Sequence, residues 1–288
     1  GLDWFDAVCH SFSSLATGGF TVRNGSIGAY GNAAVEWICI VFMFLGSINF
    51  ALYFHVFTGK AGELLRDSEF RAFLGIVLIA AVLITILVSP GLNELPEAFR
   101  HAVFQTVSVI STTGFMTEDY MRWAPAAQTV ILALFFIGGC SGSTSCGVKV
   151  IRWTVLGKQL CSEFRRLLHP HEIFTIRING APCRENIVPA VAAFLFTYFA
   201  MVFLTTLVGT LGGLELFESF TAALSMVGNI GPAFGELGPS SSCANLPAMV
   251  KWWYCFAMLA GRLELYAMLI LLGRALPLFT RRRSDETA

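Results

Sequence analysis

Three short stretches of this chain each contain a turn rich in glycine and small polar residues, a composition suited to binding an alkali cation through backbone oxygens. They read ATGGF, STTGF and GNIGP, with matching glycines Gly19, Gly114 and Gly231. A potassium ion gives up its water only where several carbonyl oxygens point at it, and glycine permits the backbone angles that this needs. The candidate ligands are Ala16, Thr17, Gly18 and Gly19 in the first turn, Ser111, Thr112, Thr113 and Gly114 in the second, and Gly228, Asn229, Ile230 and Gly231 in the third.

The three turns belong to an internal repeat. Residues 7–20 align without a gap to residues 102–115 and share a serine, Ser13 in one copy and Ser108 in the other, which the third copy keeps as Ser225. Such a repeat indicates structurally equivalent units related by pseudosymmetry. The hydroxyl and amide side chains of the turns could add ligands to the ion or hold the turns in place by hydrogen bonds.

The composition predicts an all-α membrane protein. Hydrophobic residues make up 55% of the chain and charged residues 13%, and the mean hydropathy is +0.67. An α-helix crosses the ~30 Å hydrocarbon core with about 20 apolar residues. Five candidate spans follow: Ala33 to Phe54, Phe70 to Val88, Val130 to Gly139 with its continuation, Ile187 to Leu211, and Ala248 to Leu272.

The apolar stretches that precede the three turns are shorter, at about 14 residues each, and cannot cross the bilayer. We expect them to form re-entrant helices that enter the membrane and return. Non-helical backbone at membrane depth is tolerated only inside protein or beside a water-filled cavity, because lipid offers it no hydrogen bonds. The glycine turns therefore predict a pore rather than ordinary interhelical loops.

The distribution of charge predicts the orientation. Of the 19 basic residues, 14 fall in two loops and a tail on one side of the predicted spans, which marks that side as cytoplasmic. The opposite side, where the three turns lie, has ten acidic residues and four basic ones. An acidic mouth would concentrate cations, although a plain preference of acids for the outer face explains the same count.

Residues 136–149, FIGGCSGSTSCGVK, form the most unusual stretch within a predicted span. So many glycines and hydroxyl residues cannot sustain a helix, and a mobile loop on the cytoplasmic side of the turns could block ion exit. A flexible kink for close helix packing is the alternative. The gate assignment covers Gly138, Gly139, Cys140, Ser141, Gly142, Ser143, Thr144, Ser145, Cys146, Gly147 and Lys149, together with Arg262.

Arg262 lies well inside the last predicted span, where an unpaired charge is costly and usually functional. Aligning Leu45-Gly46 with Ala260-Gly261 places it just below the third turn. Its guanidinium could meet the glycine-rich loop and regulate cation passage, or it could pair internally with a carboxylate or carbonyls. The two roles are compatible.

These motifs together resemble the TrkH/TrkG/KtrB superfamily of potassium transporters, and the TrkH-type branch fits best. The resemblance is carried by ATGGFT (16–21), STTGF (111–115), GNIGP (228–232), FIGGCSGSTSCGVK (136–149) and AGRLELYAMLIL (260–271). It implies pseudo-fourfold repeats of outer helix, re-entrant pore helix, filter loop and inner helix, as in potassium channels. It also implies potassium as the ion at the filter and an intramembrane gate.

In terms of that architecture, residues 1–69 supply the pore helix, filter and inner helix of the second repeat, and residues 70–150 the third repeat with a broken inner helix. Residues 151–184 form a cytoplasmic linker, and residues 185–288 the fourth repeat and a basic tail. The first repeat and the second repeat's outer helix have no counterpart here. We therefore expect the chain to be a piece of a longer protein that does not conduct by itself.

The resemblance further implies a homodimer in the bacterial inner membrane, with a cytoplasmic carboxyl terminus and a nucleotide-binding ring of the TrkA type as partner. The basic linker 152–184 and Arg281 to Arg283 are candidate contacts, and anionic lipids would explain their charge equally well. A proton- or sodium-coupled symporter and a structural subunit without conduction remain alternatives. An enzyme is disfavoured, because the five histidines are scattered with no partnered nucleophile.

Overall fold

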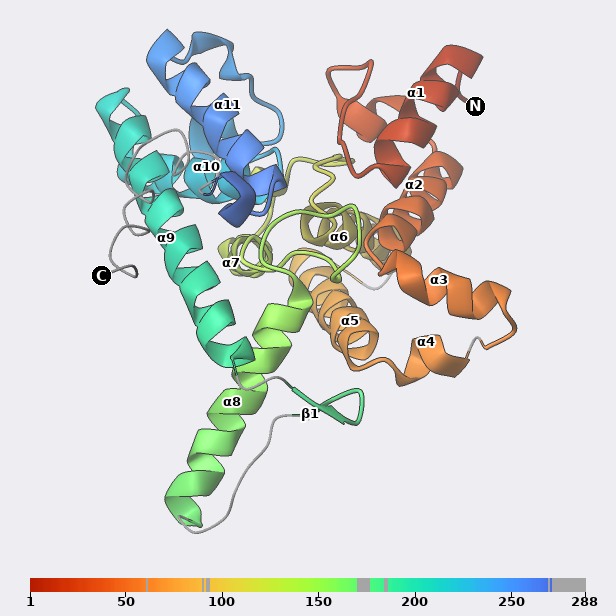
Figure 1. Ribbon diagram of the computed structural model, residues 1–288. Helices are drawn as coiled ribbons and strands as arrows, with labels where there is room; N and C mark the ends of the chain where they lie inside the picture. Colours follow the sequence, from red (N-terminus) through yellow and green to blue (C-terminus); the bar gives the residue numbers. More distant parts are fainter. Residues whose placement is uncertain are drawn as a thin grey trace.

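The computed structural model describes residues 1–60, 62–89, 91, 94–169, 177–183, 186–268 and 270, and most of them are helical. The helical class predicted from the sequence is confirmed (Figure 1). The α-helices are α1 (Trp4–Leu15), α2 (Ala33–Gly46), α3 (Phe50–Phe57), α4 (Gly62–Arg66), α5 (Ser68–Val88), α6 (Leu95–Ile110), α7 (Pro125–Leu134), α8 (Val150–Leu168), α9 (Ile187–Leu211), α10 (Leu216–Gly228) and α11 (Ala248–Arg262). A small hairpin of β1 (Arg177–Ile178) and β2 (Ala181–Pro182) precedes α9.

Two of these helices, α5 and α9, are long and apolar enough to cross a membrane on their own, as the sequence predicted for both segments. Helix α5 begins at a side-chain cap, where Asp67 Oδ1 accepts a hydrogen bond from Phe70 N at 2.8 Å. Both helices leave large apolar side chains uncovered, including Ile86 at 67% and Phe203 at 73% exposure. Apolar surface of this extent is unfavourable in water, which agrees with the membrane class predicted from the sequence.

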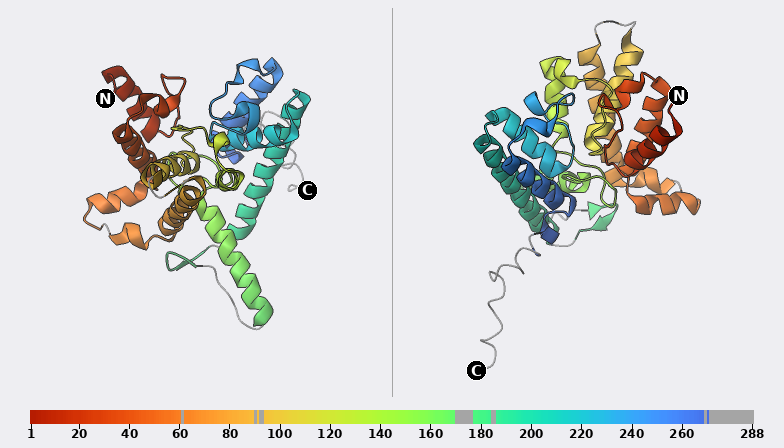
Figure 2. Two further views of the ribbon diagram at one scale, coloured as in Figure 1. Left: turned by 180° about the vertical axis from the view of Figure 1, so that it is seen from behind. Right: turned by 90° about the horizontal axis from the view of Figure 1, so that it is seen from above.

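The shorter helices α1, α6 and α10 each pack against a helix that is adjacent in the chain. Helix α6 lies on α5 and contacts α7, while α10 lies on α9 and contacts α11. Helix α1 packs on α2, which also reaches α6. The view from above shows these groups arranged around the loop that follows α7 (Figure 2). For α6 and α10 the order is long helix, short helix and following helix, whereas α1 packs on the helix that follows it.

One expected span is not a single helix. Ala33 to Phe54 is two helices, α2 and α3, bent by 98° at the break between them. The break frees backbone groups that other residues use: Cys140 N donates to Ser47 O at 2.9 Å, and Phe50 N donates to Gly142 O at 3.2 Å. Asn49 caps α3 by accepting from Ala51 N at 2.9 Å. The apolar run therefore bends where it receives the glycine-rich loop.

Two other expected spans also end early. Helix α7 ends at Leu134, and no helix follows until Val150, which is where the sequence predicted a break. Helix α11 ends at Arg262, and a turn with positive φ at Glu264 (56°) and Leu265 (50°) follows it. The backbone is helical again at residues 266–268, and the basic tail with Arg281 to Arg283 lies outside the described residues.

The linker follows the prediction of a surface helix and a short extended turn. Helix α8 projects away from the rest of the molecule, and the hairpin lies beside it (Figure 1). Its last two turns are exposed, with Leu167 at 80% and Leu168 at 76%. Only its first half packs on α5 and α9, since the buried residues it contributes are Val150 and Val155.

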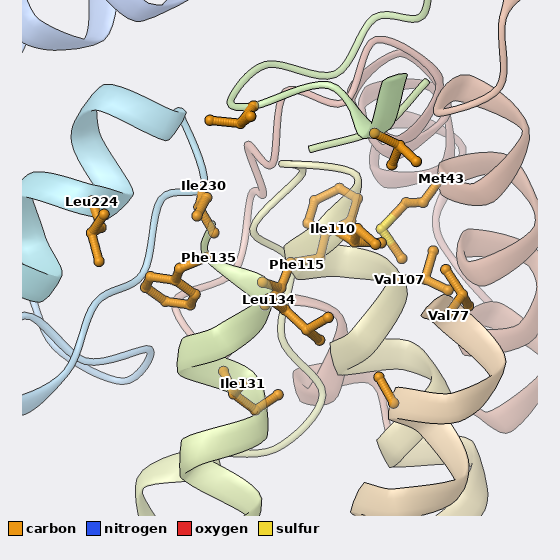
Figure 3. Packing of buried hydrophobic residues seen from close by; sticks show 14 of the residues in the cluster. Met43, Val77, Val107, Ile110, Phe115, Ile131, Leu134, Phe135, Leu224 and Ile230 are labelled. Carbon is orange, nitrogen blue, oxygen red and sulfur yellow. The ribbon is translucent and has the colours of Figure 1, made fainter. Parts of the chain in front are cut away.

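One apolar cluster joins the groups of helices at the centre of the molecule (Figure 3). It includes Met43 of α2, Val77 of α5, Ile110 of α6, Ile131 of α7 and Leu224 of α10. These side chains come from all three copies of the repeat. The cluster therefore fixes the copies relative to one another.

A buried ion pair ties α2 to α6. Arg100 Nε lies 2.7 Å from Glu36 Oε2, and Glu36 is only 3% exposed. Asp6 is engaged in a similar way, because it accepts from Tyr30 Oη at 2.7 Å and lies 3.7 Å from Arg23. Two of the ten acids assigned to the outer mouth are thus compensated within the protein.

Replacing Arg100 by alanine should leave the Glu36 carboxylate buried without its partner, at a cost of about 3–5 kcal/mol. We expect Arg100→Ala to lower the thermal midpoint of the detergent-solubilised protein clearly. Glu97→Gln is the matched control, because Glu97 is exposed and its pairing with Arg100 at 3.3 Å is a surface contact. Equal midpoints for the two variants would contradict the assignment.

Candidate functional site: three converging turns and a glycine-rich loop

The three predicted turns share one backbone conformation. Thr17, Thr112 and Asn229 have φ values of 50°, 56° and 55°. The glycines two residues further on, Gly19, Gly114 and Gly231, have φ values of 71°, 82° and 106°. A β-branched residue in this region is a genuine outlier, and strained residues of this kind persist only where the surroundings impose them.

The aligned serines impose part of this geometry through their carbonyl groups. Gly18 N donates to Ser13 O at 2.8 Å, Thr113 N to Ser108 O at 3.0 Å, and Ile230 N to Ser225 O at 2.9 Å. Each is the six-to-one bond of a helix that ends in a left-handed residue. The serine hydroxyls differ, because Ser108 Oγ donates to Phe115 O at 2.6 Å while those of Ser13 and Ser225 are buried without a partner.

The turns converge on one another. A Cβ atom added to Gly19 would lie 1.8 Å from Thr113 O, and one added to Gly114 would lie 2.2 Å from Ile230 O. A Cβ on Gly231 would in turn lie 3.8 Å from Gly114 Cα. Backbone carbonyls of the second and third turns therefore stand directly against the glycine of the preceding turn, in space that only glycine leaves open.

The glycine-rich loop, residues 136–149, is a closed structure on the same side of the turns as Gly46 and Gly261. Its two ends are joined, because Gly138 N donates to Val148 O at 2.6 Å and Val150 N to Gly139 O at 3.1 Å. A Cβ on Gly138 would lie 2.2 Å from Cys146 O. The buried Lys149 holds the interior of the loop by donating from Nζ to Ser145 O at 2.6 Å.

The loop is bonded directly to the first two turns. Thr144 Oγ1 lies 3.2 Å from Thr17 Oγ1, and it donates to Gly46 O at 3.0 Å. Cys146 N donates to Thr112 Oγ1 at 2.8 Å. The hydroxyl groups of Thr17 and Thr112 thus hold the turns to the loop, which is one of the two roles that the sequence left open.

The other polar side chains of the turns also bond within the protein. Thr113 Oγ1 lies 2.7 Å from Ser111 Oγ, and Asn229 Nδ2 donates to Met258 O at 2.9 Å. The hydroxyl groups of Thr17, Thr112 and Thr113 are therefore all hydrogen-bonded within the protein.

Arg262 contacts the loop from the other side. Its Nη1 donates to Thr144 O at 2.6 Å and lies 3.0 Å from Cys146 Sγ. The guanidinium therefore meets the loop and bonds to one of its carbonyls, while a role in regulating cation passage stays a prediction. Glu264, two residues away, pairs instead with Arg152 at 3.2 Å. A cavity of about 240 Å³ separates the loop from α9, α10 and α11.

The family model TrkH, described as a cation transport protein, matches residues 2–278. The chain belongs to the TrkH family. It is 37% identical over 285 residues to the Trk system potassium uptake protein TrkI of Halomonas elongata, covering 98% of this chain and 57% of the relative. It is 37% identical to the Trk system potassium uptake protein TrkH of Vibrio parahaemolyticus, covering 94% of this chain and 57% of the relative.

The crystal structure of the potassium transporter TrkH from Vibrio parahaemolyticus superimposes with a TM-score of 0.84 at 33% identity, over 94% of this chain and 59% of that chain. The resemblance inferred from the sequence is thereby confirmed. This TrkH-family chain spans just under three fifths of the relatives it matches.

The predicted equivalence of Gly46 and Gly261 is visible in this TrkH-family chain. A Cβ on Gly46 would lie 2.8 Å from Leu15 O at the end of α1, and one on Gly261 would lie 2.0 Å from Val227 O at the end of α10. Each glycine lets a following helix approach the carboxyl end of a short helix. In the remaining copy the glycine-rich loop interrupts the corresponding helix.

Sequence reasoning missed one residue of this site. Glu69 is 6% exposed in the first turn of α5 and bonds to the glycine-rich loop and to the start of α8, accepting from Ser141 N at 2.6 Å and Ile151 N at 3.2 Å. The available signal was an acid at the start of an otherwise apolar span. Its partners lie 72 and 82 residues away, so no local pattern identifies them.

The contact at Gly261 gives a prediction in which local and tertiary effects have opposite signs. Glycine to alanine within a helix normally stabilises by about 0.5–1 kcal/mol, but the new methyl group at Gly261 would meet Val227 O. We expect Gly261→Ala to lower the thermal midpoint, since overpacking costs about 1–3 kcal/mol. The control is Gly157→Ala in α8, where no atom lies within 4 Å of the new carbon and the midpoint should hold or rise.

Proposed function

We propose that the full-length protein takes up potassium across the bacterial inner membrane through a filter of backbone carbonyls contributed by the three turns. The relatives named above are potassium uptake proteins or a potassium transporter. In this proposal α1, α6 and α10 are the pore helices of pseudo-fourfold repeats. Residues 16–19, 111–114 and 228–231 supply three sides of the filter, and potassium is the ion bound there.

The observation that supports this most is the convergence of the turns. Replacing the water shell of an alkali cation needs several carbonyl oxygens around one axis. Three equivalent turns, each with a left-handed residue followed by glycine and each placed against the next, meet that need. The side-chain hydroxyls are engaged elsewhere, which leaves the carbonyls as the coordinating groups.

The glycine-rich loop acts as the gate in this proposal. It is bonded to Thr17 and Thr112 in two of the turns and is held by Arg262. The adjoining cavity of about 240 Å³ offers space into which the loop can withdraw. Opening then requires the loop to exchange its bonds to the turns for other partners.

We further propose that the protein works as a homodimer seated on a cytoplasmic nucleotide-binding ring of the TrkA type, with its carboxyl terminus on the cytoplasmic side. Helix α8 supports this, because it projects from the membrane part and exposes Arg165 and Arg166 near its end. Basic residues there suit an acidic surface on a partner. A binding assay with the partner ring tests this contact. Anionic lipid vesicles without the partner are the control, because lipid head groups could attract the same basic residues.

Potassium or rubidium flux into liposomes containing the full-length protein tests the filter. Gly114→Ala should lower flux and reduce the preference for rubidium over sodium by about tenfold or more, because its Cβ would meet Ile230 O. Gly75→Ala, where no atom lies within 4 Å of the new carbon, should leave both unchanged. Unaltered ion preference in a folded Gly114→Ala protein would refute the filter assignment.

The same assay tests the gate. Arg262→Gln should raise rubidium flux several-fold, because it weakens the charge-assisted hydrogen bond to Thr144 O and so favours loop displacement. Lys251→Gln, which alters a basic residue on the opposite face, is the control. Lower flux from correctly folded Arg262→Gln would indicate that the loop has a packing role instead.

A further inference from the structure

Glu69 of α5 bonds to two segments that are distant from it in sequence, the glycine-rich loop and the start of α8. A single oxygen, Oε1, accepts hydrogen bonds from Ser141 N at 2.6 Å and from Ile151 N at 3.2 Å. Ser141 belongs to the first half of the glycine-rich loop, and Ile151 belongs to the first turn of α8. A buried carboxylate is costly unless it is hydrogen-bonded, and these two amides compensate it.

Helix α8 depends on this carboxylate for its start. Lys149, the residue at its N-cap position, makes no side-chain capping bond. The first amides of a helix have no partner within the helix, and negative charge there is favourable. The Glu69 carboxylate, which belongs to α5, supplies a hydrogen-bond acceptor and a negative charge at this position, so it caps α8 from another helix.

Because one oxygen serves both donors, Ser141 and the start of α8 are fixed to the same point on α5. Displacement of α8 must either break the bond to Ile151 or disturb the bond to Ser141. Between these anchors lie Gly142 and Gly147, whose φ values of 73° and 71° suit hinges. The segment that bonds to the turns, with Thr144 and Cys146, lies between the two glycines.

We propose that Glu69 is a positioning residue that holds the glycine-rich loop in its closed place and couples it to movement of α8. The inference rests on the proposed gate, and it adds the link through which the exposed end of α8 acts on that gate. A partner that displaces α8 weakens the shared carboxylate clamp. Ser141 is then released, and the hinged segment leaves the turns.

Deuterium exchange of the full-length protein tests the clamp without reference to transport. Glu69→Gln keeps the shape and an acceptor oxygen but removes the charge, which makes both hydrogen bonds weaker. Exchange in peptides covering residues 138–151 should accelerate by about threefold or more, and further in Glu69→Ala. Unchanged exchange there in both variants would overturn the proposal.

Asp67→Asn is the matched control. Asp67 is a carboxylate two residues earlier that caps α5 itself, through Phe70 N at 2.8 Å, and its bonds do not reach the loop. It should alter exchange at the start of α5 and leave residues 138–151 unchanged. If Asp67→Asn accelerates exchange in the loop as much as Glu69→Gln does, the effect is a general loosening of α5 and the clamp is refuted.

Rubidium flux then tests the coupling to the gate. Glu69→Gln should raise flux several-fold, and combining it with Arg262→Gln should give less than the product of the two separate effects, because both act on closure of one loop. Multiplicative effects would overturn the coupling. If the wild-type protein shows no rubidium flux, the proposed function is rejected. If flux changes in Gly114→Ala and Arg262→Gln but not in Glu69→Gln, only this inference is rejected.

Discussion

Satisfying the polar groups of non-helical backbone within an apolar molecule is the constraint on which this structure depends. Lipid cannot hydrogen-bond those groups, so each break in a helix needs a partner inside the protein. The break between α2 and α3 bonds to the glycine-rich loop. Cys140 N of the loop donates to Ser47 O, and Phe50 N donates to Gly142 O of the loop. The bend of 98° is therefore a consequence of where the loop lies.

The same constraint explains how the three turns are held. Each is closed by a bond to the carbonyl of an aligned serine, so the turns keep their shape without help from water. Their remaining polar side chains bond to the loop, to one another or to α11. The carbonyls that stand against Gly19 and Gly114 are left free of these roles, which supports the proposal that they face an ion.

The pseudosymmetry is informative where it fails. Gly46 and Gly261 perform the same packing task in two copies, while the corresponding helix of the other copy is replaced by the loop after α7. That difference places non-helical backbone beside the first two turns. Two charged residues bond to different parts of it, Arg262 to Thr144 O and Glu69 to Ser141 N.

The sequence by itself determined the helical membrane class, the long helices α5 and α9, the break after α7, the linker helix with a short extended turn after it, and the family. These depend on local composition, and on motifs such as STTGF and GNIGP that carry their own backbone requirement. Only the tertiary structure decided the bend at Ser47 to Asn49, the convergence of the turns and the role of Glu69. The reason is physical: apolar periodicity shows where a helix is favourable, but whether a buried carbonyl or carboxylate is satisfied depends on partners brought together by folding, such as Arg262 and Thr144, which are 118 residues apart.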